Sequence, residues 1–429
     1  MKAQQKPPKR PVNDAILARV SAISNFRLSF EFDFSKYVIY ASHQLITFLF
    51  SMTTLLQRDL QAWRDIRGLD TAEEIAQQPA LWRELGASLQ SRAADVAAFL
   101  GGCLHNRQQR VILTGAGSSA YAGEIVADEL NAAWPAQVRA VATTSLLTHP
   151  ELYLDAEAPT LLVSFARSGS SPESLAAVEL VRDIVADARF LTITCNAQGQ
   201  LARQGDTDAR TFNLLMPAAS CDRGFAMTSS FSCMLLAALC MLGKGEWNDR
   251  IAALAHAGDA ALRDWAAPVA ALAAQPVQRV VYLGSGPLEA LARESALKIL
   301  ELTGGRVLAM SNSPLGFRHG PKSALNQQSL VVLFHSSKAL SRRYEEDLLQ
   351  ELRRDGIAGR IVTVGGDTDI SVAAPSLSDA WLAPLWLLMA QQYALHQSAA
   401  LGLTPDNPFA DGTVNRVVQG VTIYRHDQF

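Results

Sequence analysis

The sequence predicts an α/β fold made of two doubly wound parallel sheets, each covered by helices on both faces as a three-layer domain. From about residue 106 onward, short apolar runs alternate with longer amphipathic stretches, which is the pattern of successive strand–helix–strand units. The alternation stops at a helix-rich stretch, 227–274, and then begins again. In both halves an apolar run leads into a glycine-serine turn, which suggests an internal duplication.

Each short apolar run is expected to form one strand. These runs lie at 111–113, 138–141, 161–163, 190–194 and 211–215 in the first half, and at 280–283, 307–309, 330–334 and 361–364 in the second. Helical patterns lie at 81–100, 122–133, 172–186, 227–242, 251–274 and 380–401. Thr71 and Glu74 have the spacing of a capping box at an earlier helix start. The last helix contains Pro384 and polar side chains, so we expect a core helix rather than a membrane span.

These patterns divide the chain into five parts. We expect an N-terminal extension at 1–68, a helical lead-in at 69–105, a first α/β domain at 106–250, a second at 251–403 and a C-terminal tail at 404–429. A chain of 429 residues is too long for a single hydrophobic core, which agrees with more than one domain.

The composition excludes several classes of protein. Apolar residues make up 49% and charged residues 18% of the chain, which is typical of a globular protein with buried cores. A net charge of −3 gives no reason to expect a nucleic-acid partner. The five cysteines are odd in number and contain no Cys-x-x-Cys pair. We therefore expect reduced thiols in a cytoplasmic protein, without disulfides or a zinc site.

One segment of the N-terminal extension allows two interpretations. Residues 37–57 contain no Asp, Glu, Lys or Arg and reach the minimum length of a transmembrane helix. Polar residues such as Ser42, His43 and Gln44 dilute the segment, which makes it a poor membrane span. We expect a packing or oligomer-contact segment, or an upstream extension with no fold of its own, and no membrane contact. The alternative is a membrane-anchored interaction protein.

Three ionisable residues share one face of the helix expected after the second glycine turn. Glu294, Lys298 and Glu301 recur at i, i+4 and i+7 and are interleaved with apolar residues. They follow an apolar strand and the turn Gly284–Gly286, an arrangement that places a site at the carboxyl end of a parallel strand. Acid, base and cation on one helix face predict proton-transfer chemistry. The plainer interpretation of Glu301 is a surface carboxylate paired with Lys298.

The loop Phe317–Lys322 adds an imidazole to this set. Histidine is a side chain suited to proton transfer. His319 lies in a loop whose glycines and proline favour a tight turn. The alternative is a structural histidine, with Arg318 and Lys322 as solvated charges.

Two loops have the composition of phosphate-binding sites. Gly115–Ser119 lies between an apolar strand and a helical run, where glycine lets the backbone approach an anion and helix amides point toward it. Ser164–Ser174 follows a strand and contains five serines, an arginine and a glycine, with Pro172 at the start of the next helix. The alternative for the second loop is a flexible serine-rich segment.

Neither loop has the pattern of a nucleotide site. Ala120 stands where a dinucleotide fingerprint would place its third glycine, and the Gly-Lys-Ser/Thr ending of a Walker loop is missing. We expect a sugar phosphate rather than ATP or a nicotinamide cofactor, and no cofactor or metal. In a third block, 221–230, Thr228–Ser230 are either helix caps or pocket residues, and both interpretations stay open.

Taken together, these motifs resemble the sugar isomerase (SIS) domain family, whose flavodoxin-like domain would be present twice from about Leu69 onward. The sequence is most similar to the bacterial galactosamine-6-phosphate deaminase/isomerases, also described as tagatose-6-phosphate ketose/aldose isomerases. Five blocks carry the resemblance: 164–174, 222–230, 293–302, 316–323 and 412–421. Residues 1–68 lie outside it.

The resemblance implies a role for each matching residue. Glu301 would move a proton between C2 and C1, while His319, Glu294 and Lys298 would open the sugar ring and orient the open chain. The substrate phosphate would be held by Ser119, Arg167, Ser168 and Ser171, with Ser118 and Ser174 beside them. Where the related synthase has a lysine in its tail, this chain has Gln419, with Arg416 nearby, so these two residues are candidate tail contacts.

The implied activity is the conversion of galactosamine 6-phosphate to tagatose 6-phosphate and ammonia. Ammonia release is favoured over incorporation because nothing here corresponds to the glutaminase domain of glucosamine-6-phosphate synthase. The family also implies a homo-oligomer, a dimer or larger, in which His319 or the tail acts across subunits. Alternatives are a plain hexose 6-phosphate isomerase, a glucosamine-6-phosphate deaminase and a non-enzymatic sugar-phosphate sensor.

Overall fold

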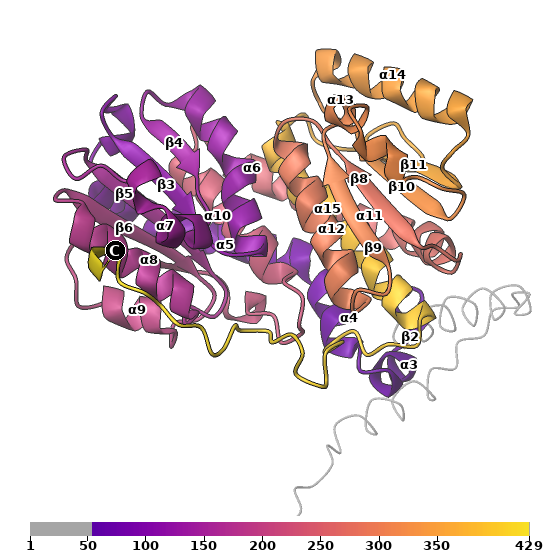
Figure 1. Ribbon diagram of the computed structural model, residues 1–429, viewed down its shortest axis with the longest axis horizontal. Helices are drawn as coiled ribbons and strands as arrows, with labels where there is room; N and C mark the ends of the chain where they lie inside the picture. Colours follow the sequence, from indigo (N-terminus) through magenta and orange to yellow (C-terminus); the bar gives the residue numbers. More distant parts are fainter. Residues whose placement is uncertain (1–53, 429) are drawn as a thin grey trace, which may run out of the picture. The chain divides into compact units, whose positions relative to one another are not determined.

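The computed structural model describes residues 54–428, which form one compact unit (Figure 1). The extension up to residue 53, and with it most of the apolar segment 37–57, lies outside the described residues. The described chain begins with a small antiparallel hairpin of β1 (Thr54–Leu55) and β2 (Arg58–Asp59). The helices α3 (Leu60–Asp65), α4 (Leu69–Ala76) and α5 (Gln78–Leu100) follow.

The first sheet has five parallel strands in the order β4-β3-β5-β6-β7. Its strands are β3 (Arg110–Thr114), β4 (Gln137–Ala140), β5 (Thr160–Ala166), β6 (Ala188–Thr194) and β7 (Thr211–Leu215). One face packs on α7 (Thr143–Thr148), α8 (Pro172–Ile184) and α9 (Gln200–Gly205). The other face packs on α5, α6 (Ser118–Ala133) and α10 (Ser229–Leu242). Because β5 is buried on both faces, its sequence is a continuous apolar run.

The second sheet has the same strand order as the first, β9-β8-β10-β11-β12, and is also parallel. Its strands are β8 (Arg279–Leu283), β9 (Leu308–Asn312), β10 (Ser329–Phe334), β11 (Arg360–Gly365) and β12 (Ile370–Ser371). One face packs on α13 (Pro314–Phe317) and α14 (Ala339–Asp355). The other face packs on α11 (Asn248–Ala273), α12 (Pro287–Leu302) and α15 (Asp379–Ala400).

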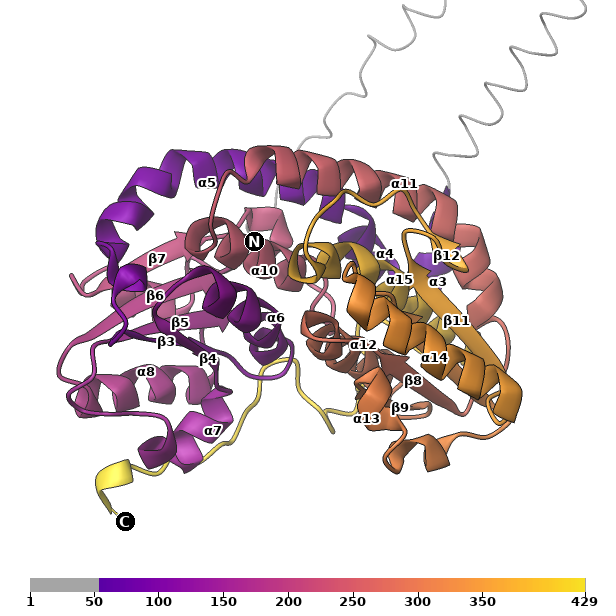
Figure 2. The ribbon, with the colours of Figure 1, turned by 90° about the horizontal axis from the view of Figure 1, so that it is seen from above.

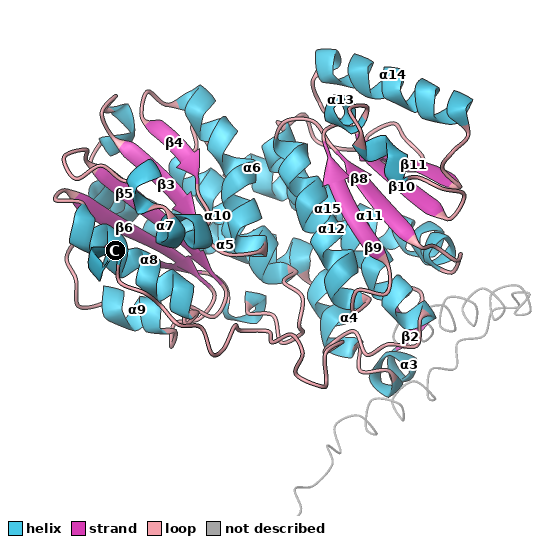
Figure 3. Cartoon of the chain, viewed as in Figure 1, coloured by secondary structure: helices cyan, strands magenta, loops and turns pink. Residues whose placement is uncertain are grey.

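A single large core joins the two halves, because helices from both contribute to it. Figures 2 and 3 show the two sheets separated by this helical layer, with α5 and α11 running along its edge. Its largest buried side chains include Trp82, Trp265 and Trp386, the last two stacked with ring centroids 6.2 Å apart. The layer also brings α6 of the first half beside α12 of the second, where Arg293 forms ion pairs with Glu124 and Glu289.

The predicted fold class is confirmed, and each expected strand lies within a few residues of an observed one. The capping box was wrong: α4 begins at Leu69, and Thr71 lies inside it with its hydroxyl donating to Asp406 Oδ1 at 2.7 Å. Helix α14 and strand β12 were not anticipated. The division at 106, 251 and 404 stays a prediction. Within residues 54–428, no helix is both long and apolar enough to cross a membrane.

The loop before α10 is organised by one buried carboxylate. Asp222 accepts hydrogen bonds from the backbone amides of Thr228, Ser229 and Ser230, at 2.8 to 3.0 Å, and from the hydroxyls of Thr228 and Ser230. These amides lie at the start of α10, where a helix has no internal acceptors for them. Asp222 is fully buried. Of the two interpretations of Thr228–Ser230, the structure therefore supports the structural one.

Replacing Asp222 by Asn should lower the free energy of unfolding by about 3 kcal/mol, because a buried charged acceptor is lost and a donor faces donors. Urea unfolding of the variant and the parent measures this difference. Asp249→Asn is the matched control, since Asp249 also lies in the first turn of a helix but is exposed. A loss at Asp222 no larger than that of the control would contradict this account of the loop.

Candidate active site

The predicted ionisable row lies on one face of α12, as its spacing requires. The Lys298 ammonium lies 3.2 Å from Glu294 Oε1 and 2.6 Å from Glu301 Oε2. Glu294 and Lys298 have no exposed surface, whereas the Glu301 side chain is 21% exposed. The buried ammonium of Lys298 thus lies between two carboxylates. Glu294 is buried, and Glu301 is the one that a substrate can reach.

Burial and charge act in opposite directions on this row. Burial raises the pKa of Glu294 to about 7, although the neighbouring ammonium of Lys298 lowers it. Burial would lower the pKa of Lys298, but the carboxylates of Glu294 and Glu301 outweigh it and raise this pKa. Lys298 therefore stays charged at neutral pH.

Ser118 connects this row to the first half of the chain. As the first residue of α6, its hydroxyl donates to Glu294 Oε1 at 3.0 Å and accepts from the Lys298 ammonium at 3.1 Å. We expected Ser118 among the phosphate contacts. The structure places it on the ionisable row, and it does not line the cavity described next.

A cavity of about 130 Å³ lies at the carboxyl end of the first sheet. Five of the expected phosphate-binding residues line it: Ser119, Arg167, Ser168, Ser171 and Ser174. Ser171 caps α8, because its hydroxyl accepts from the Ser174 amide at 3.3 Å. Hydroxyls, a guanidinium and the amide end of a 13-residue helix thus converge on one space, which suits a phosphate group.

The tail completes this cavity. It crosses from the end of α15 to the first sheet (Figure 1), where Arg416, Val417 and Val418 join the lining. Arg167 is only 8% exposed, and its guanidinium donates to the carbonyls of Phe225 and Arg416 at 3.0 and 3.2 Å.

The electrostatics of Arg167 favour an anion in this cavity. Burial and the charge of Arg416 both lower the pKa of Arg167, so two guanidinium groups face one space. The carboxylate of Glu301 acts in the opposite direction, which shows that the ionisable row and the cavity influence one another. Ser118 and Ser119 lie on the boundary between them.

The loop of His319 is fixed by its neighbours. Arg318 forms ion pairs with Asp347 and Glu351 at 2.8 and 2.7 Å, and Lys322 pairs with Glu351 and Asp355, all on α14. These two cations are therefore not merely solvated charges.

Two of the predicted site residues, His319 and Gln419, do not line this cavity. His319 and Gln419 are exposed, and neither side chain has a hydrogen bond or ion pair in this part of the chain. The cavity is also lined by Glu173, Met227, Val417 and Val418, which were not predicted individually as site residues. They lie within the blocks 164–174, 222–230 and 412–421 that carry the resemblance. The tail lacks periodicity, so only a resemblance pointed to it.

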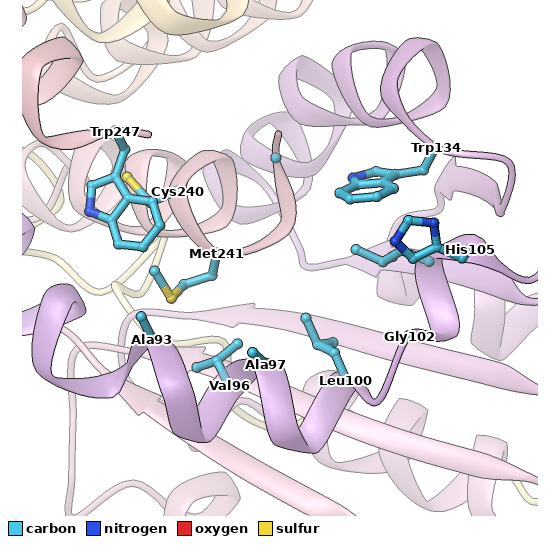
Figure 4. A pocket seen from close by; sticks show the side chains of 12 residues that line it. Ala93, Val96, Ala97, Leu100, Gly102, His105, Trp134, Cys240, Met241 and Trp247 are labelled. Atoms are coloured by element: carbon cyan, nitrogen blue, oxygen red, sulfur yellow. The ribbon is translucent and has the colours of Figure 1, made fainter. Parts of the chain in front are cut away.

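A separate cavity of about 370 Å³ lies between the ends of α5 and α10 (Figure 4). Its lining is mostly apolar, with Trp134, Met241 and Trp247 as its largest side chains. Neither a carboxylate nor an Arg or Lys lines it, so it does not suit a sugar phosphate. Within residues 54–428, no group of three His, Cys, Asp or Glu side chains could hold a metal ion.

The chain is similar to known proteins in both sequence and structure. Residues 104–242 match the SIS domain. The chain is 42% identical to the D-galactosamine-6-phosphate deaminase AgaS of Shewanella sp. strain ANA-3, over 82% of this chain and 91% of the relative. It is 44% identical to the protein of the same name from Escherichia coli, over 83% and 96%. The crystal structure of the tagatose-6-phosphate ketose/aldose isomerase from Escherichia coli superposes with a TM-score of 0.76, at 40% identity, over 84% of this chain and 98% of that one.

The fold, the serine cavity and these similarities together place the chain in the SIS-domain family. Its relatives within that family are proteins named as D-galactosamine-6-phosphate deaminases.

Glu294 should make stability depend on pH. Since its pKa rises from 4.5 in the unfolded chain to about 7 in the folded protein, folding takes up a proton between these values. The stabilising contribution is complete below pH 4.5 and is lost as the pH rises through 7, a change on the order of 3 kcal/mol. Glu294→Gln should reduce this slope, while the part that comes from Glu74, whose pKa burial raises to about 8, remains. Glu289→Gln on the same helix should keep the whole slope. Urea unfolding across pH 4.5 to 8 tests this, and an unchanged slope in Glu294→Gln would contradict it.

Proposed function

We propose that this protein is a deaminating isomerase that converts D-galactosamine 6-phosphate to D-tagatose 6-phosphate and ammonia. The observation that carries the proposal is the junction of two chemistries at the start of α6. Ser119 lines a cavity suited to phosphate, and the adjacent Ser118 contacts a carboxylate–ammonium–carboxylate row. The names of relatives that share more than 40% of their residues with this chain support the same reaction.

The mechanism begins with binding of the substrate phosphate. Ser119, Ser168, Ser171 and Ser174 donate hydroxyl hydrogens to the phosphate, and Arg167 supplies a charge from the back of the cavity. Arg416 adds a second charge from the tail, and Gln419 follows it as a further tail contact. A held phosphate restricts the open sugar chain, so that C1 and C2 meet the helix α12 in an effectively intramolecular reaction.

Ring opening uses the ionisable row together with His319. Glu294 and Lys298 orient the substrate, and His319 transfers the proton that opens the ring. His319 is exposed, and ion pairs of its neighbours hold its loop against α14. We therefore assign it to the site of a neighbouring subunit in a homodimer or larger homo-oligomer.

Proton transfer by Glu301 follows. In the open chain, Glu301 removes the proton from C2, between the aldehyde and the amine, and returns it to C1. In the same step the amine loses a proton and the C1 oxygen gains one, so that C1 becomes a hydroxymethyl group and an imine forms between C2 and nitrogen. Water adds to this imine, and the C–N bond breaks to give the ketose phosphate and ammonia. This last step is a hydrolysis.

The two halves of the chain have different roles in this proposal. The two α/β domains, at 106–250 and 251–403, form a repeat in which the first binds phosphate and the second supplies α12. The protein acts in the cytoplasm on a small-molecule amino sugar phosphate. The helical lead-in at 69–105 and the tail at 404–429 frame the two domains.

A second candidate is plain aldose–ketose isomerisation of a hexose 6-phosphate. It is favoured by the similar structure that is named as a ketose/aldose isomerase. The base would act in the same way, but a hydroxyl at C2 would leave a ketone directly. Glucosamine 6-phosphate differs from the galacto sugar at one hydroxyl and is the alternative deaminase substrate. A sensor has no use for the Glu294–Lys298–Glu301 row.

Ammonia release decides among these functions. Purified protein with EDTA is incubated with galactosamine 6-phosphate or with glucosamine 6-phosphate, and ammonia is measured. Release from the galacto sugar alone is expected. Release from the gluco sugar alone would change the substrate, and interconversion of hexose 6-phosphates without ammonia would establish the isomerase.

Glu301→Gln should abolish the proton transfer without abolishing binding. Because a positioned base contributes at least about a hundredfold, exchange of the C2 proton with solvent deuterium should fall by at least that factor. NMR measures the exchange, and ligand-induced thermal stabilisation reports binding. Glu289→Gln, at the other end of the same helix, should exchange at the parent rate. Retained exchange in Glu301→Gln would eliminate this residue as the base.

Removing phosphate contacts should act on KM rather than kcat. Ser168→Ala combined with Ser171→Ala, and separately Arg416→Ala, should each raise KM by about tenfold, the equivalent of about 1.4 kcal/mol of lost binding energy. Arg425→Ala is the control, because Arg425 also lies in the tail but does not line the cavity. An unchanged KM in the serine variant would refute the phosphate cavity.

A further inference from the structure

The second half of the chain repeats the turn that forms the phosphate cavity in the first. Gly117 and Gly286 precede α6 and α12 with nearly identical backbone angles, φ 56°, ψ −129° and φ 57°, ψ −127°. Both lie in the left-handed region that favours glycine. The strands before them pair in the same way, with Thr114 opposite Ser164 and Leu283 opposite Leu333. By this register, Ser285 corresponds to Ala116.

The same register aligns the loops that leave the central strands. Arg167 and Ser168 follow β5, and Ser336 and Ser337 take their positions after β10. The helices that come next also correspond. In α8 the buried positions include Ser174, Ala177, Val178 and Val181, and in α14 they are Glu345, Leu348, Leu349 and Leu352, with the same spacing. By this spacing Glu345 aligns with Ser174, which lines the phosphate cavity. It lies one turn further into its helix, as the seventh residue of α14 where Ser174 is the third of α8.

Four donors of the second turn and loop are directed at carboxylates. Glu345 has no exposed surface, and its two oxygens accept from the Ser285 hydroxyl at 2.7 Å and from the Ser336 amide at 3.0 Å. Asp379 accepts from the Ser336 hydroxyl and from the Ser337 amide. Hydroxyl and amide donors from a glycine turn and from a strand-end loop are the groups that bind a phosphate.

We propose that the second domain contains an oxyanion site of the same construction as the first, and that the Glu345 carboxylate occupies it in place of a phosphate. At this point the first half has Ser174 and the second half has Glu345. The second half also has serines, Ser285 and Ser336, at the positions of Ala116 and Arg167. With its own carboxylate in the second site, the chain has one site for a phosphate ester instead of two.

The surroundings of Glu345 leave room for such a ligand. A cavity of about 510 Å³ lies beside the turn and is lined by Ser285, Gly286, Lys338 and Asp379, among others. Lys338 would supply a cation to a phosphate there. Removing the Glu345 side chain would connect this cavity with the donors that it now occupies.

Glu345→Ser makes the second site resemble the first and tests the proposal. Inorganic phosphate is titrated into the full-length protein by calorimetry, and the number of phosphates bound per chain is compared with the parent. We expect one additional phosphate in Glu345→Ser and none in the control Glu346→Ser, whose side chain is 46% exposed. The experiment measures only the difference in bound phosphate between variant and parent. Its result therefore does not depend on whether the first cavity acts on galactosamine 6-phosphate. A folded Glu345→Ser variant without an additional phosphate would overturn the proposal.

Refolding answers the same question if Glu345→Ser does not fold in anion-free buffer. The denatured variant is diluted into increasing phosphate, with chloride at equal ionic strength as the control. Recovery of folded protein that increases with phosphate and not with chloride supports the site. Recovery that is absent or equal in both salts would overturn it.

Discussion

The buried ammonium of Lys298 is the group on which the arrangement of the site depends. A cation without solvent contact is tolerated only with compensating charges and hydrogen bonds, here from Glu294, Glu301 and Ser118. Ser118 belongs to α6 and the other three residues to α12, so satisfying this charge requires the two helices to pack together. The same contact brings the ionisable row of α12 beside the start of α6, where Ser119 lines the serine cavity. Stability and chemistry therefore have a common origin at this contact.

Each half of the fold contributes a different part of the site. Parallel strands end at the same edge of a sheet, so the loops after β3 and β5 meet there and form the serine cavity. The second sheet uses its corresponding turn to begin α12, and this helix points its ionisable face at the first half. Because the two similar domains face each other across one helical layer, the cavity of the first lies near the ionisable face of α12 from the second.

Much of this could be predicted from the sequence. Strands buried on both faces are continuous apolar runs, so β5 and β10 were visible, and the i, i+4, i+7 spacing placed Glu294, Lys298 and Glu301 on one face. The different destinations of Ser118 and Ser119 were not visible, because one residue along a helix turns a side chain by about 100° and only tertiary packing says what it meets. Helix α14 was missed because its apolar stripe is short and its other positions are mostly charged.

The position of the tail has a consequence for the order in which the site is assembled. Arg167 belongs to the first domain, but one of its two carbonyl partners, at Arg416, follows the second domain in the chain. During synthesis the first sheet can fold early, since its strands are consecutive, while the cavity still lacks the side that the tail provides. Only after α15 has left the ribosome can the tail reach back across the molecule. The cavity is therefore completed only when the tail docks. In a nascent chain, the folded first domain has a cavity that lacks the side formed by Arg416, Val417 and Val418.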